Sequence, residues 1–126
     1  MSRIIKAGSG WRLGWDPSAG LGLVGNDDWA IELNQTEFQD FCYLLNQLQK
    51  TMQAMAEELM PEETITCDAE TTSVWMEAMG YSDRYSIRFI LNTNRRCEGF
   101  WPSKSVAELV VASQDLARLT GMPEPI

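Results

Sequence analysis

The chain has 126 residues, 44% of them hydrophobic, and a formal net charge of −8 at pH 7. This length predicts a single domain over residues 1–126 with enough apolar side chains for a core. The acidic balance disfavours nucleic-acid binding, which draws much of its affinity from basic residues. No apolar run reaches the roughly 18 residues of a membrane span, and no signal peptide is indicated.

The chain has three widely separated cysteines, Cys42, Cys67 and Cys97. They form neither a CxxC pair nor a disulfide framework, so we interpret them as reduced thiols of a cytoplasmic protein. Arg95 and Arg96 precede Cys97 and would lower its pKa if the groups were close, but alternation along a strand favours its burial.

Strand patterns precede the first helix. Alternating apolar and polar side chains predict half-buried strands at 11–16 and 29–34. A short apolar run at 21–24 predicts another strand between them. Turn residues at 16–20 and 25–28 separate these three segments.

The next segment carries the longest pattern in the chain. Apolar residues three and four apart predict a helix from about Thr36 to Met60, roughly 37 Å long at about 1.5 Å per residue. A capping box at its start is formed by Asn34 with Glu37, or by Thr36 with Gln39. The seven apolar positions are Phe38, Phe41, Leu45, Leu48, Met52, Met55 and Leu59.

This apolar face is wider than a coiled-coil seam because Tyr43 and Leu44 adjoin it. We therefore expect the helix to pack on the sheet of its own chain, with residual surface available for a homodimer. Pro61 follows the helix and cannot continue it.

A second set of strands and a second helix follow. Ser105 with Glu108 is a possible capping box for a helix that opens at 102–105 and is stopped by Gly121 and Pro123. Strands are predicted at 64–70, 73–81, 85–91 and 97–101. The apolar stripe of the helix consists of Val106, Leu109, Val110, Leu116 and Leu119.

The element order is strands, helix, strands, helix, which differs from strict βαβ alternation. It predicts an α+β fold, an antiparallel β-sheet with one long and one shorter helix, built from two passes of strands and then a helix.

Catalytic signals are sparse. The chain has no histidine, which removes the commonest general base and metal ligand. No phosphate-binding or dinucleotide-binding glycine motif stands in the right context, so we expect no cofactor. Asp27 and Asp28 are the best carboxylate pair for a metal ion, but adjacent aspartates after Gly25 and Asn26 favour a hairpin turn.

The most suggestive stretch is 95–102, which places Arg95, Arg96 and Trp101 just before a helix. With Trp11, Arg12 and Arg88 these residues could form a surface of rings and cations. Such a surface suits single-stranded nucleic acid or a protein partner. The third interpretation is that the tryptophans fill the core and the arginines are solvated or paired.

Two pairs of segments carry a family resemblance. One is 26–33 running into 37–45, and the other is 85–91 followed by 95–102. Over nearly its whole length the chain resembles a family of small uncharacterised proteins from oxygenic phototrophs, numbered 1818 among the domains of unknown function. The resemblance implies a fold similar to the Whirly-type single-stranded-DNA-binding transcriptional regulators, and it implies no assigned activity or catalytic residue.

The sequence thus favours a non-enzymatic binding protein that acts through a protein partner in a phototroph. The residues expected to bind it are Arg88, Arg95, Arg96, Trp101, Trp11 and Arg12. The alternative is a single-stranded nucleic-acid-binding regulator, which requires these arginines and aromatics to gather on one sheet face away from the acids.

Overall fold

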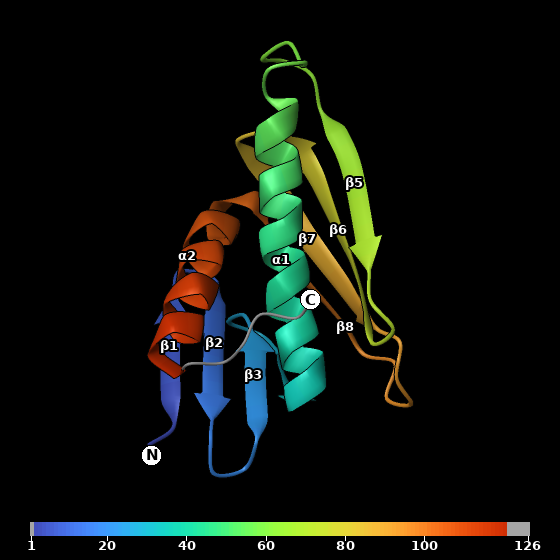
Figure 1. The fold of residues 1–126 in the computed structure, drawn as a ribbon. Helices are drawn as coiled ribbons and strands as arrows, with labels where there is room; N and C mark the ends of the chain where they lie inside the picture. The colour runs from blue at the N-terminus through green and yellow to red at the C-terminus, as the bar shows by residue number, and fades with distance from the viewer. Residues whose placement is uncertain (1, 121–126) are drawn as a thin grey trace.

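The computed structural model describes residues 2–120 (Figure 1). Its elements follow the order four strands, helix, four strands, helix, and both sets of strands are antiparallel. This confirms the α+β class and the two passes of strands followed by a helix. The strands form two four-stranded sheets, whereas the sequence pattern predicted one, because each set pairs within itself through short hairpins.

The first sheet pairs its strands in chain order. Its first strand was not predicted, because the adjacent residues Ile4 and Ile5 break the alternation of a half-buried strand. The Ser9–Gly10 turn joins this strand to the second one as a hairpin. The strands are β1 (Ile4–Gly8), β2 (Trp11–Asp16), β3 (Leu21–Gly25) and β4 (Ala30–Asn34).

The long helix α1 spans Gln35–Met55. It begins at the predicted capping box, in which the Asn34 side chain accepts from the Glu37 N–H and the Glu37 side chain accepts from the Asn34 N–H. It ends before the predicted Met60, so the predicted length was too great. Its last turn has no basic residue, and the acidic side chains that follow at 57–58 are unfavourable at the negative end of a helix dipole.

The second sheet also pairs its strands in chain order, and all four segments were predicted from the sequence. Its strands are β5 (Ile65–Glu70), β6 (Val74–Tyr81), β7 (Arg84–Leu91) and β8 (Glu98–Trp101). The inward and outward side chains of β7 alternate without a break, which is the burial pattern of a sheet covered on one side.

The second helix, α2, spans Ser103–Thr120. Ser105 lies inside its first turn and donates to the backbone oxygen of Ser9, while Glu108 accepts from Trp11. The capping box predicted from Ser105 and Glu108 is therefore wrong, because both side chains bind the β1–β2 hairpin instead. The predicted stop signals Gly121 and Pro123 lie outside the described residues.

Both helices pack on the two sheets (Figure 1). α1 contacts β5 and β6 and also reaches β3 and β4, while α2 contacts β2 and β7. The apolar face of α1 is buried against its own chain, as predicted, and one connected core joins helices and sheets. α1 leaves no large apolar side chain exposed, so the predicted homodimer finds no support from this helix. Neither helix is long and apolar enough to cross a membrane.

The contact between β3 and α1 gives a stability prediction. A Cβ at Gly22 would lie 2.3 Å from Cγ and Cδ1 of Phe38, so Gly22→Ala must displace the start of α1. We expect a loss of about 2 kcal/mol in the free energy of unfolding, measured by urea denaturation. Gly20→Ala is the comparison, because a Cβ there meets nothing within 4 Å and the positive φ of +66° costs only about 1 kcal/mol. An equal loss in both variants would contradict the steric argument.

Candidate functional site

Two of the six predicted binding residues, Trp11 and Trp101, lie in the core with 6% and 0% of their surface exposed. The indole N–H of Trp11 donates to Oε1 of Glu108 at 2.8 Å, and that of Trp101 donates to the backbone oxygen of Gly25 at 2.9 Å. Both rings are therefore almost fully buried and hold elements of the fold together.

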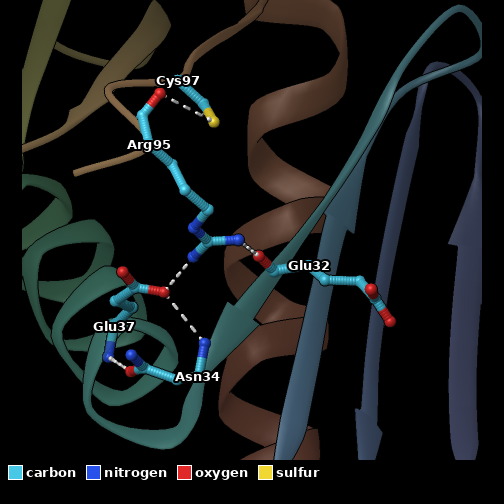
Figure 2. Close-up of polar contacts among 5 residues, drawn as sticks. All are labelled: Glu32, Asn34, Glu37, Arg95 and Cys97. Atoms are coloured by element: carbon cyan, nitrogen blue, oxygen red, sulfur yellow. Dashed lines mark hydrogen bonds and ion pairs between the residues drawn. The ribbon is translucent and has the colours of Figure 1, made fainter. Parts of the chain in front are cut away.

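Arg95 closes the start of α1 (Figure 2). It follows β7 in a loop and donates to the carboxylate of Glu37 and to the backbone oxygen of Glu32. The Glu37 side chain is 3% exposed and also accepts from the N–H of Asn34 at 2.9 Å. Arg95 thus links the second sheet to β4 and to the helix cap, which is a structural role.

Arg12 and Arg96 have different surroundings. Arg12 lies on the outer side of β2, and its Nε and Nη2 donate to the backbone oxygen of Asn26 at 3.1 and 2.9 Å. Arg96 is exposed in the loop after β7 with a positive φ of 48°. The predicted arginines are therefore distributed over several parts of the surface.

Arg88 occupies the outer side of β7 and is exposed. Its guanidinium carbon lies 5.2 Å from the ring centre of Trp75, which is a cation–π distance. The Trp75 indole in turn donates to Oδ2 of Asp68 at 3.0 Å. Phe100 stands opposite Arg88 in the β7–β8 register and is 47% exposed.

We name the outer side of the second sheet the Trp75 face. It is open because the buried side chains of β6, β7 and β8 point to the opposite side, where the helices pack. Its larger side chains are Asp68, Glu70, Trp75, Glu77, Met79, Tyr81, Arg84, Arg88, Ile90, Glu98 and Phe100.

The Trp75 face carries four carboxylates and two guanidiniums. Arg84 lies over the ring of Tyr81 at 4.9 Å, so both cations sit on aromatic rings. A nucleic-acid surface requires arginines and aromatic residues that lie together and away from acidic residues. On the Trp75 face the arginines and aromatic rings do lie together, but the carboxylates lie among them, so the second requirement is not met. Arg12 and Arg95 lie elsewhere and add nothing to this face.

Sequence reasoning singled out Arg88 and the stretch 95–102 that contains Phe100, but it missed Trp75 and Met79. Alternation along each strand places these side chains on the side away from the buried positions, so their outward direction could be predicted from the sequence. The approach of Trp75 and Phe100 to Arg88 could not be predicted from the sequence, because it depends on the register between β6, β7 and β8.

The aspartate pair behaves as a turn. Oδ1 of Asn26 accepts from the N–H groups of Asp28 and Trp29 at 2.7 and 3.0 Å. This confirms the turn interpretation of Asp27 and Asp28. Residues 2–120 contain no cluster of three or more His, Cys, Asp or Glu side chains arranged to hold a metal ion.

The three cysteines carry free thiols. Burial raises the pKa of the Cys42 thiol to about 12, so this thiol stays protonated at neutral pH. Cys97 is half-buried, and its thiol donates to the backbone oxygen of Arg95 at 3.7 Å (Figure 2). The guanidinium of Arg95, two residues before Cys97, is thus engaged with Glu37 and not with the sulfur.

Comparison with known proteins gives a family and a fold. A family model described as a domain of unknown function, DUF1818, matches residues 6–116. A crystal structure from Prochlorococcus sp. NATL2A, described as a protein with unknown function from the DUF155 family, is similar with a TM-score of 0.84. The two chains are 29% identical, over 90% of this chain and 98% of that one. None of the curated proteins matches this chain. The likeness to Whirly-type regulators stays a prediction.

The role of Arg95 can be tested by stability. Arg95→Ala leaves the buried Glu37 carboxylate without its guanidinium, and we expect it to lower the free energy of unfolding by about 1–3 kcal/mol. Arg96→Ala, in the same loop but exposed, is the control and should change it by less than about 0.5 kcal/mol. Equal effects in urea denaturation would mean that Arg95 does not hold the helix start.

Proposed function

Since this chain belongs to the DUF1818 family, a domain of unknown function, we propose a function from its exposed surface: a non-enzymatic binding protein that recognises a protein partner through the Trp75 face. One observation carries the proposal. Trp75, Arg88 and Phe100 lie together in the open on three paired strands.

The composition of this face is that of a binding hot spot. Trp, Tyr and Arg are enriched among residues that dominate binding energy, while charged residues such as Glu are depleted there and stand at the rim. On the Trp75 face both arginines, Trp75 and Tyr81 lie on the central strands β6 and β7. Three of the four carboxylates stand on the flanking strands β5 and β8, and the fourth, Glu77, lies on β6 opposite Arg88. Met79, 52% exposed, adds an adaptable apolar contact.

The cluster is also pre-organised. The bond from Trp75 to Asp68 fixes the indole, and the indole supports the Arg88 guanidinium from one side. Arg88 forms no ion pair with any of residues 2–120, so its N–H donors stay available. A partner that offers a carboxylate to Arg88 and an apolar side chain to Phe100 loses little entropy in ordering this surface.

Substitution on the face tests the proposal. We expect Arg88→Ala/Phe100→Ala to reduce recovery of a specific partner from a cyanobacterial lysate by about tenfold, because hot-spot residues each contribute more than 1 kcal/mol. The measurement is quantitative mass spectrometry of proteins retained by the immobilised wild type and variant. Both side chains are exposed, so the fold should be unaffected, which circular dichroism verifies.

The matched control is Lys104→Ala/Leu119→Ala, which removes an exposed cation and an exposed apolar side chain from α2. This variant should retain the partner that the face variant loses. Identical partner lists for the wild type and the face variant would overturn the proposal.

The nucleic-acid alternative is tested separately. Fluorescence anisotropy with mixed-sequence single-stranded DNA and RNA should show no binding from low to physiological salt, because carboxylates outnumber guanidiniums on the Trp75 face. Binding that weakens as salt rises and disappears in Arg88→Ala would instead assign this face to nucleic acid.

A further inference from the structure

A second surface lies at the edge of the first sheet, away from the Trp75 face. An open groove of about 590 Å³ runs between β1 and α2. It is lined by Lys6, Ala7 and Gly8 of β1, by Trp11, and by Ala107, Glu108, Val111, Ala112 and Asp115 of α2. The groove therefore has a strand for one wall and a helix for the other.

The strand wall has an unpaired edge. β1 pairs with β2 on one side, and none of the other strands in residues 2–120 pairs with its second side. In an antiparallel pair the backbone groups of alternate residues point away from the partner strand. β1 consequently presents N–H and C=O groups along the groove that another extended chain can satisfy.

The helix wall is held at a fixed position over β1. The bond from Trp11 Nε1 to Glu108 Oε1 passes against Gly8, where an added Cβ would lie 2.3 Å from Nε1 and 2.7 Å from Oε1. The Ser105 hydroxyl makes a second link by donating to the backbone oxygen of Ser9. These links set the spacing of the two walls without filling the groove.

The middle of the helix wall is apolar and open. Val111 is 54% exposed, although its neighbours Val110 and Ala112 are buried at 6% and 4%. The carboxylates of Glu108 and Asp115 lie on the same wall, and Asp115 also pairs with Arg118. Lys6 is the single cation of the lining.

We propose that this groove binds an extended peptide segment of a partner protein, which adds a fifth strand beside β1. Strand addition between a sheet edge and a helix supplies affinity through the main chain and specificity through alternate side chains. The alternate side chains that face α2 would be an apolar one on Val111 and basic ones beside Glu108 and Asp115. This binding goes beyond the Trp75 face and does not depend on it.

The charge of the groove selects a basic peptide. The lining holds the carboxylates of Glu108 and Asp115, the second of which is paired with Arg118, and one ammonium group, while the whole chain has a net charge of −8. Opposite charges speed encounter and suppress the wrong partner, so an acidic peptide of the same apolar content should be excluded.

The test uses short fluorescent peptides in which lysine, valine and lysine occupy alternate positions with threonines between them, so that all three face the same side of a strand, and measures anisotropy with the full chain. We expect saturable binding of this lysine peptide and about tenfold weaker binding of its counterpart with glutamate in place of lysine. A lysine peptide that is N-methylated at alternate residues keeps the side chains but loses backbone donors, and should also bind about tenfold more weakly. Equal binding of all three, or binding of none, would overturn the proposal.

Two exposed residues provide matched variants. Val111→Arg fills the groove and adds a repelling charge, so it should abolish peptide binding. Met60→Arg places the same charge at a similarly exposed site between α1 and β5, outside both proposed surfaces, and should leave peptide binding intact. Analytical ultracentrifugation distinguishes a partner peptide from a second copy of this chain as the occupant of the groove. A wild-type dimer that dissociates in Val111→Arg would overturn the peptide proposal in favour of the second copy.

Discussion

The indole of Trp101 joins the parts of this fold. Its N–H donates to Gly25 of the first sheet, while its ring stacks on Phe89 of the second sheet with centroids 5.5 Å apart. The same ring lies 5.1 Å from Trp29 and 5.5 Å from Phe41 of α1. One side chain from β8 therefore contacts both sheets and the long helix, and the buried polar bond makes its position specific because an unpaired indole N–H there would cost free energy.

This inward concentration of aromatic side chains determines which surfaces stay open. Because the helices cover the inner sides of both sheets, the outer sides and the free strand edges remain exposed. The Trp75 face is one outer side, and the groove along β1 is one such edge. A sheet made rigid by its packed side can present side chains on its other side with little loss of entropy on binding.

Sequence reasoning predicted the elements better than their assembly. Strand patterns, chiefly alternation together with the short apolar run at 21–24, located seven of the eight strands, and the three–four spacing from Phe38 to Met52 located α1. β1 was not predicted because Ile4–Gly8 lacks regular alternation of apolar and polar side chains. The end of α1 was predicted too late because the acidic residues after Met55 destabilise the helix although the apolar spacing continues. The division into two sheets depends on which hairpins pair with each other, and the hydrophobic periodicity of the individual strands does not show this.

The arginines show why the candidate site was harder to predict than the fold. Arg12, Arg88 and Arg95 all lie near aromatic residues in the sequence, but their roles are decided by acceptors that arrive from distant segments. Arg95 meets the buried carboxylate of Glu37, 58 residues away, and Arg12 meets the carbonyl of Asn26. Arg88 lies between Glu77 and Phe100 in the register and over the ring of Trp75, and it forms no ion pair within residues 2–120, so the ring supports its charge without satisfying its donors. An exposed arginine held by a ring keeps its hydrogen-bonding capacity for a second molecule, whereas one held by a carboxylate has used it within the fold.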